Sequence, residues 1–367
     1  MGWFAACSSL VLVGLVALVV QILYFSPIQD PILLENSPLS SPIASPIPIN
    51  NKLQTVIKLG EGLVKDPEDV SVDKDGVLYA CSRDGWILRL HRNGSWEHWK
   101  NLHSSTMLGT TITTQGDLIV CDADKGLLKI KEDGVTVLVS QVKGSKLSFA
   151  DDVIEASDGS LYFSVASTKF DFHNWYLDLL EARPHGQLLK YNPITNQTSI
   201  LMDNLGFANG VALSKDEHYL VICESWKYSC LRHWLKGEKK GKTETFLENL
   251  PGAPDNINLA PDGTFWLALL QGSPEGLGFV HSSKILKHVV ASFPSLIEVM
   301  KGGLYKKAMV ANVGGDGQII RMFDDNEGKV MNVLTSAVEF EDHLYLASLN
   351  GNFIGKLPLP KLAAPTN

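Results

Sequence analysis

The chain of 367 residues carries a formal net charge of −8 and is 45% hydrophobic. This acidic balance argues against nucleic acid and anionic membrane surfaces as partners, because both require clustered Lys and Arg. The length allows either one large all-β domain or two smaller domains, so the order of the elements must decide.

The N-terminal stretch is apolar and contains no charged residue from Trp3 to Phe25. It is longer than the apolar part of most secretory signals, so residues 1–25 are predicted to be a signal peptide or, as the favoured alternative, an uncleaved signal anchor. Residues 26–51 hold six prolines and predict an extended Pro/Ser-rich linker. The folded domain is expected over residues 52–360, and a short tail over residues 361–367.

A segment of 15 residues recurs six times in the folded part, as in "EDVSVDKDGVLYACS" and "DNINLAPDGTFWLAL". The copies begin at Glu68, Leu108, Asp151, Asn209, Asp255 and Leu334. A turn such as Asp-Gly between two apolar runs predicts a hairpin, and further strand patterns follow each copy. Repeats of about 40 residues with several strands each indicate an all-β, six-bladed β-propeller. Residues 52–59 are expected to complete the sixth blade and close the ring.

The spacing between repeats widens at two places, where "FDFHNWYLDLLEARP" and "SSKILKHVVASFPSLIEVMKGG" show helical spacing. We expect two helical insertions on one face of the propeller, which in repeat proteins is often the binding face. His173, His185 and His281 lie in or near these insertions. They could line the mouth of a site, although a surface or capping role is the more common one for a histidine.

Two sequons, at Asn93 and Asn196, follow strand-like runs and fit the surface turns of a glycosylated secretory protein. Four cysteines follow the N-terminal segment: Cys81, Cys121, Cys223 and Cys230. They are too few for a disulfide-built scaffold and lack metal-type spacing. Cys81 and Cys121 occupy equivalent repeat positions and are predicted to be buried thiols, whereas the pairing of the others stays open.

The first two positions of each repeat place polar side chains around the predicted axis. The first positions are Glu68, Leu108, Asp151, Asn209, Asp255 and Leu334, and the second are Asp69, Gly109, Asp152, Gly210, Asn256 and Thr335. Four of the six first positions carry side-chain oxygens, which suit Ca²⁺ better than Zn²⁺. Acidic residues before strands also cap turns, but four copies in register favour a cation. Asp69 and Asp152 could form turns or hold a second, deeper cation.

The motifs "GFANGVALSKDEHYLVICES", "LPGAPDNINLAPDGTFWLALL" and "PEDVSVDKDGVLYACSRDGWILRL" resemble those of strictosidine synthase-like proteins, a group that includes the adipocyte plasma membrane-associated proteins. The resemblance covers about residues 52–358 and extends more distantly to paraoxonases and other calcium-dependent propeller lactonases. It implies a six-bladed propeller whose axial calcium is held by Glu68, Asp151, Asn209 and Asp255, with Asn256 as a further ligand. Asp69 and Asp152 match the structural calcium site of the paraoxonases.

Two positions depart from these relatives. The catalytic His of the paraoxonases falls on Leu108, and the glutamate that strictosidine synthase requires falls on Thr335. Glu339, four residues further on, could replace that glutamate only if the alignment shifts.

The favoured function is calcium-dependent hydrolysis of a lactone or ester, a small-molecule substrate. Asp255 would activate water or attack the substrate directly, and Glu68 completes the predicted catalytic pair. One alternative is condensation of an indole amine with an aldehyde, the strictosidine synthase type of reaction. A second alternative is a non-catalytic, membrane-tethered glycoprotein. The expected location is the secretory pathway, in the endoplasmic reticulum or vacuole, with the folded domain lumenal or extracellular.

Overall fold

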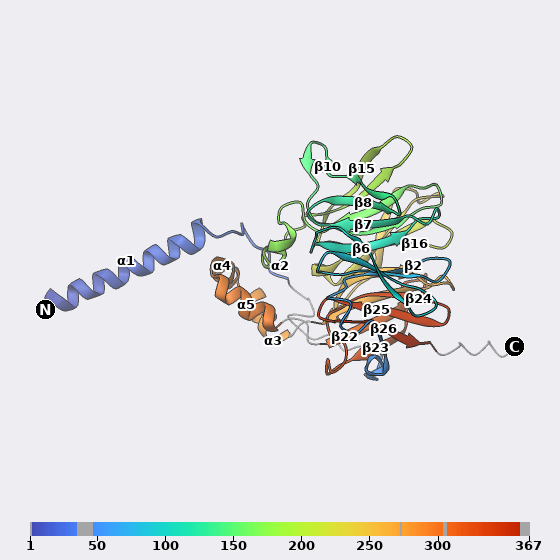
Figure 1. The fold of residues 1–367 in the computed structure, drawn as a ribbon. Coiled ribbons are helices and arrows are strands. Elements are labelled where there is room, and N and C mark those ends of the chain that lie inside the picture. Colours follow the sequence, from blue (N-terminus) through green and yellow to red (C-terminus); the bar gives the residue numbers. More distant parts are fainter. Residues whose placement is uncertain (1, 35–46, 272–273, 304–306, 360–367) are drawn as a thin grey trace.

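The computed structural model describes residues 2–34, 47–271, 274–303 and 307–359. These residues form six four-stranded antiparallel sheets around a central axis (Figure 1), which confirms the predicted propeller. Residues 35–46 of the predicted linker and the whole predicted tail lie outside the described residues.

Five blades follow one another along the chain, each running from an inner to an outer strand. Blades 1 and 2 comprise β2 (Val70–Val72), β3 (Leu78–Cys81), β4 (Trp86–Leu90) and β5 (Trp96–Asn101), then β6 (Met107–Ile112), β7 (Leu118–Asp122), β8 (Gly126–Lys131) and β9 (Gly134–Val139). Blade 3 comprises β12 (Ala150–Glu155), β13 (Leu161–Val165), β14 (Gly186–Asn192) and β15 (Gln197–Leu205). Blades 4 and 5 comprise β16 (Ala208–Leu213), β17 (Tyr219–Glu224), β18 (Ser229–Trp234) and β19 (Thr243–Leu247), then β20 (Ala253–Leu259), β21 (Phe265–Gln271), β22 (Lys307–Val313) and β23 (Ile319–Asp325). A small hairpin of β10 (Gln141–Val142) and β11 (Ser145–Lys146) follows β9.

The sixth blade joins the two ends of the folded domain. Its inner strands are β24 (Leu334–Phe340), β25 (His343–Ser348) and β26 (Ile354–Pro358). Strand β1 (Ile57–Leu59) pairs antiparallel with β26, with Ile57 opposite Lys356, so the predicted closure is confirmed. The extended part is shorter than predicted, because Lys52–Thr55 forms a 3₁₀ turn, η1.

Apolar side chains of neighbouring blades fill the space between the sheets. Strands β7 and β13 are buried at every position, as strands with a blade on either side require. Phe163 and Phe265 are completely buried in the largest cluster. Cys81 and Cys121 are buried thiols within this packing, as predicted.

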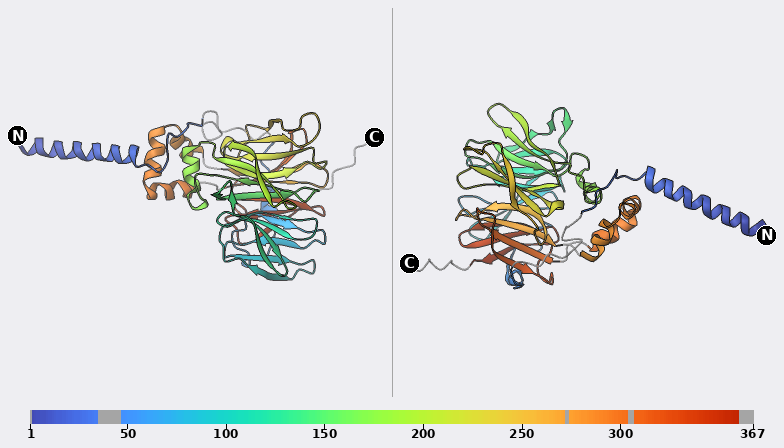
Figure 2. Two further views of the ribbon diagram at one scale, coloured as in Figure 1. Left: turned by 90° about the horizontal axis from the view of Figure 1, so that it is seen from above. Right: turned by 180° about the vertical axis from the view of Figure 1, so that it is seen from behind.

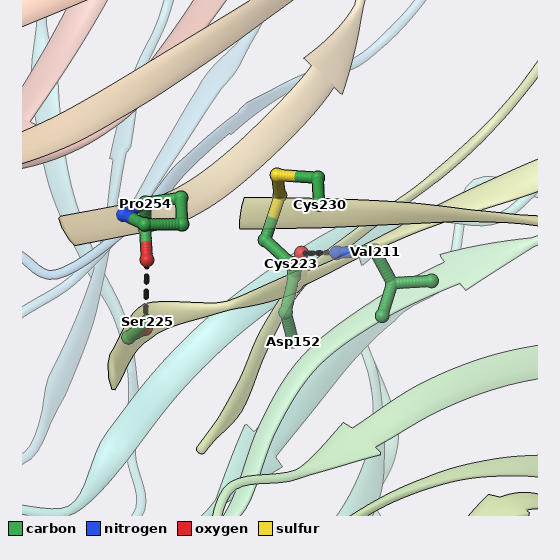
Figure 3. The surroundings of a disulfide bond; sticks show 6 residues. All are labelled: Asp152, Val211, Cys223, Ser225, Cys230 and Pro254. Atoms are coloured by element: carbon green, nitrogen blue, oxygen red, sulfur yellow. Dashed lines mark hydrogen bonds between the residues drawn. A yellow bond between two sulfur atoms is a disulfide. The ribbon is translucent and has the colours of Figure 1, made fainter. Parts of the chain in front are cut away.

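A disulfide joins Cys223 on β17 to Cys230 on β18, at directly opposed positions of the two strands. Figure 3 shows contacts on either side of it that tie blade 4 to its neighbours. Asp152 of blade 3 accepts a hydrogen bond from the Val211 amide, and the Ser225 hydroxyl donates to the Pro254 carbonyl of blade 5. The disulfide therefore lies close to the contacts that hold three blades together.

The two helical insertions lie next to each other at one end of the propeller (Figure 2). The first, η2 (Phe172–Asn174) and α2 (Trp175–Glu181), joins β13 to β14. The second, α3 (Pro274–His281), α4 (Lys284–Ser292) and α5 (Pro294–Gly303), joins β21 to β22. Both join a second strand to a third, so antiparallel order places them at the end where every inner strand begins. The expectation of a common face is confirmed.

Helix α1 (Gly2–Tyr24) precedes a segment that packs on the insertions. Ile28 is buried between α2 and α4, and the backbone amides of Gln29 and Ile32 donate to Glu181, through its side chain and its carbonyl respectively. The described start of the predicted linker is therefore bound to the folded domain. Within the described ranges, no helix combines the length and hydropathy needed to cross a bilayer, so the predicted membrane anchor is not confirmed.

Candidate active site

The inner strands of five blades are irregular at the positions that the repeat places on the axis. The strand pairing shifts between Met107 and Thr110, Ala150 and Val153, Ala208 and Val211, Pro254 and Ile257, and Leu334 and Ser336. Such β-bulges leave residues out of the regular ladder and re-aim their side chains. The sequence therefore places its polar pairs where the strand itself turns them toward the channel.

The first-position residues of four blades meet at one cavity. Glu68, Asp151, Asn209 and Asp255 line a cavity of about 220 Å³ and are 3–5% exposed. Asn256 lies beside them, 1% exposed, and its Nδ2 donates to Glu68 Oε1 at 2.8 Å. The structure thus brings together all five residues that the sequence assigned to a cation, in the group called the axial ring below.

Three oxygens of the axial ring have no hydrogen-bond partner within the described part of the chain: Glu68 Oε2, Asn209 Oδ1 and Asn256 Oδ1. Buried polar atoms are rarely left unpaired, so each implies an absent water, ion or ligand. Among the described residues, no three His, Cys, Asp or Glu side chains by themselves form a metal cluster. Ca²⁺ also accepts amide oxygens, and the mixed carboxylate and amide set of the axial ring fits it.

Burial and mutual repulsion make the axial ring unfavourable when it is charged and metal-free. Burial raises the pKa of Asp255 to about 7, and raises the pKa values of Glu68 and Asp151 well above their ordinary range. The negative charge of Asp255 adds to the rise for both of these neighbours. Carboxylates in this arrangement require either protons or a cation.

The second-position carboxylates bind backbone of the next blade. Asp69 Oδ2 accepts from the amide and hydroxyl of Thr110, at 2.7 and 3.0 Å. Asp152 accepts from the amides of Val153 and Val211, each at 2.7 Å. Only Asp69 Oδ1 lacks a geometric partner among the described residues, although Ser336 lies close enough to lower the pKa of Asp69. A second cation at Asp69 and Asp152 stays a prediction.

The glycines that alternate with these carboxylates leave room for the next blade. A Cβ at Gly109 would lie 2.5 Å from Asp152 Oδ1, and one at Gly210 would lie 2.4 Å from the Asp255 carbonyl oxygen. No side chain can be added at these distances without moving the neighbouring strand. The second position therefore serves contact between blades in the carboxylate copies and the glycine copies alike.

The sixth blade contributes Val333 to the cavity, one residue before the position read from the sequence. Leu334 is completely buried in the core between blades 5 and 6, and Thr335 donates to the Glu68 carbonyl. Glu339 accepts from the Trp266 indole at 2.6 Å and does not line the cavity. Leu108 lines it, as read from the repeat.

The remaining walls come from residues that the sequence reasoning did not assign. Five aromatic rings follow one another from the first insertion to blade 4: Phe172, Phe149, Phe207, Trp226 and Trp175. Arg83, in the turn between β3 and β4, faces the cavity from blade 1. Both features lie in loops at the site end, where no periodic pattern marks them.

The three singled-out histidines lie elsewhere, and none is among the described residues that line the cavity. The His173 side chain is 62% exposed, 3.5 Å from Asp124. His185 contacts Glu181 at 2.8 Å, and His281 is buried in the second insertion, where burial lowers its pKa to about 3.

Both sequons lie on exposed turns at the other end of the propeller. Asn93 lies between β4 and β5, and Asn196 between β14 and β15. Turns that join third to fourth strands lie opposite the loops that join second to third strands. A glycan at either sequon would therefore leave the cavity mouth uncovered.

Comparison with known proteins identifies the family. A sequence profile described as strictosidine synthase matches residues 151–238, and one described as strictosidine synthase-like, N-terminal, matches residues 47–90. The chain is 33% identical to Protein STRICTOSIDINE SYNTHASE-LIKE 4 of Arabidopsis thaliana, covering 90% of this chain and 89% of that protein. It is 31% identical to the adipocyte plasma membrane-associated protein of Bos taurus, covering 92% and 86%.

Solved structures share the fold at low sequence identity. A gluconolactonase of Xanthomonas campestris superposes with a TM-score of 0.60 at 15% identity, over 91% of this chain and 98% of that one. The calcium-binding protein regucalcin of Agrobacterium tumefaciens gives 0.54 at 15% identity, over 84% and 96%. Likeness at this identity concerns the fold alone. Repeat, propeller and full-length relatives agree that the chain belongs to the strictosidine synthase-like family.

Proposed function

We propose that this protein is a calcium-dependent hydrolase of small lactones or esters that works in the secretory pathway. The observation that carries the proposal is the axial ring: a buried set of carboxylates and amides, three of whose oxygens contact no described residue. This ring forms the polar part of a cavity whose walls are otherwise mainly apolar. A few polar groups in an apolar pocket are typical of small-molecule sites.

Glu68, Asp151, Asn209, Asp255 and Asn256 would hold the ion. A bound Ca²⁺ would polarise the carbonyl oxygen of a lactone or ester. Asp255 lines the cavity and can take a proton from a water molecule there. Glu68 is held by the Asn256 amide on one oxygen, so its carboxylate has a fixed orientation. The aromatic wall binds the apolar part of the substrate and keeps bulk water away from the ring.

The proposed location rests on three observations. The Cys223–Cys230 disulfide fits an oxidising compartment. The two sequons are exposed, and relatives at about 30% identity are named as associated with the plasma membrane of adipocytes. The gluconolactonases among similar structures support lactones as a substrate class only through the shared fold.

The full-length protein, assayed against lactones and aryl esters in calcium and in EGTA, tests the proposal. Hydrolysis should require calcium, and Asp255→Asn should lower kcat by at least 100-fold, within the range of general-base contributions. Glu339→Gln is the matched control, because that carboxylate binds Trp266 instead of lining the cavity. Full activity in EGTA, or in Asp255→Asn, would contradict the proposal.

Condensation of an amine with an aldehyde is not proposed. It requires a base, and the residue of blade 6 at the cavity is Val333. Thr335 is buried behind it and donates its proton to a backbone carbonyl.

A further inference from the structure

Arg83 is held rigidly at the edge of the cavity. Its backbone amide donates to the Lys65 carbonyl at 2.8 Å. Its Nη1 donates to the carbonyls of Ser105 and Met107 at 2.8 and 3.1 Å, and its guanidinium lies 4.9 Å from the centre of the Phe172 ring. Contacts on three segments fix the plane of this cation before any ligand binds, which lowers the entropy lost on binding.

One nitrogen of this guanidinium remains open. Arg83 Nη2 is buried and contacts no hydrogen-bond acceptor of the described residues. Nor does any described carboxylate come within ion-pair distance of Arg83, although Glu68 and Asp151 act on its charge from further away. A buried cationic donor without an acceptor is unfavourable, so the site is built to receive one.

The cavity places this donor opposite an aromatic wall. The rings of Phe207 and Trp226 lie 4.2 Å apart, and Phe149 packs edge-on against Phe207 at 5.2 Å. The axial ring lies between this wall and Arg83 in the order of residues that line the cavity. A ligand that contacts all three must combine an apolar ring, a carbonyl group and an acceptor for Arg83.

We propose that Arg83 binds a carboxylate of the substrate, so that the preferred substrates are esters or lactones that carry an aromatic or alicyclic body and one carboxylate. This inference rests on the proposed hydrolase function. A carboxylate forms charge-assisted hydrogen bonds with a guanidinium. A phosphate dianion fits less well, because only Nη2 is open and the axial ring adds negative charge nearby.

The test compares two esters that differ only in charge, 4-acetoxybenzoate and 4-acetoxybenzamide, with the full-length, calcium-loaded protein. Wild type should favour the benzoate by kcat/KM, and Arg83→Met should lower the ratio of benzoate to benzamide by about 10- to 100-fold, as expected for hydrogen bonds to charged groups. Arg321→Met is the matched control, since this arginine also lies over an aromatic ring, that of Trp266, but away from the cavity.

A binding measurement separates this inference from the proposed function. The fluorescence of Trp175 and Trp226, which line the cavity, should report binding of 4-phenylbutyrate in preference to 4-phenylbutyramide, without turnover. If neither ester is hydrolysed but Arg83→Met selectively loses phenylbutyrate binding, the hydrolase proposal fails and the carboxylate subsite stands. Arg83→Lys, which keeps the charge, should retain part of the preference and replaces Arg83→Met if that variant fails to fold.

Two outcomes would overturn the subsite. One is an unchanged preference for the carboxylate ligand over its amide in a folded Arg83→Met protein. The other is a variant that binds calcium differently while keeping its ligand preference, which would make Arg83 only a counter-charge for the axial ring.

Discussion

The axial ring and the second-position carboxylates arise from adjacent residues of the same repeats, yet their surroundings differ. Asp152 gives both of its oxygens to backbone amides, one of them from the next blade, and Asp69 binds Thr110 of the next blade through Oδ2. Glu68, Asn209 and Asn256 each keep one oxygen that no described residue contacts. Burial is nearly the same for both sets. Hydrogen-bond partners, and not burial, therefore separate residues that hold the fold from residues that await a ligand.

The largest effect should come from breaking a second-position contact. Asp152→Ala removes the acceptor of the Val153 and Val211 amides, so the free energy of unfolding should fall by about 3 kcal/mol. The loss should be the same in calcium and in EGTA, measured by chemical denaturation. Asp133→Ala, at an exposed turn, is the control and should change little. A loss seen only in calcium would place Asp152 in a metal site.

The axial ring should respond to calcium in the opposite way. A ligand that binds only the folded chain adds about 2.7 kcal/mol at a hundredfold excess over its Kd, which raises the thermal midpoint. Glu68→Gln and Asp255→Ala should lose this response, whereas Asp152→Ala should keep it from a lower starting midpoint. Identical melting curves of wild type in calcium and EGTA would refute the cation site.

A smaller effect should appear when pH is varied in EGTA. Burial raises the pKa of Asp255 to about 7 from an ordinary value of 3.8, so the folded chain binds a proton that the unfolded chain releases. The stability gained from that proton is fully present below pH 3.8 and is lost as the pH rises through 7. Asp255→Asn removes this loss, so the variant should be more stable than wild type at pH 8, by about 2 kcal/mol, since each pKa unit is worth about 1.4 kcal/mol and lost contacts offset part of the gain.

Thermal midpoints at pH 4, 6 and 8 check this expectation. The advantage of Asp255→Asn should vanish at pH 4, and calcium should reverse it at pH 8. A variant that is less stable than wild type in EGTA at every pH would show that Asp255 is satisfied within the fold.

Local patterns of the sequence predicted most of the fold. The hairpin of each copy depends on a turn and two apolar runs within 15 residues, so the repeat is visible without tertiary information. Closure by the N-terminal strand followed from the short last copy. The assignment of Leu334 was wrong because the bulge of β24 is one residue shorter than the others, a feature set by its pairing with β25.

Contacts between distant segments could not be predicted in the same way. The Cys223–Cys230 pair becomes apparent only once the register of β17 and β18 is known. The segment after α1 reads as a linker by its prolines, but Ile28 finds an apolar site between two insertions. Arg83 was missed because its role depends on carbonyls of the next blade and on a ring from an insertion.

The smallest effect on the folded protein should come from glycosylation. In a eukaryotic secretory host, endoglycosidase treatment should shift the mass, and Ser95→Ala together with Thr198→Ala should abolish the shift. These changes are preferable to replacing the asparagines, because Asn196 has a φ of 52° and accepts a hydrogen bond from Tyr191. Both turns lie at the end opposite the cavity mouth, so the double variant should hydrolyse esters like wild type. Unmodified protein recovered from the cytosol would contradict a lumenal domain, and a loss of activity with folding intact would mean that the two ends of the propeller are coupled.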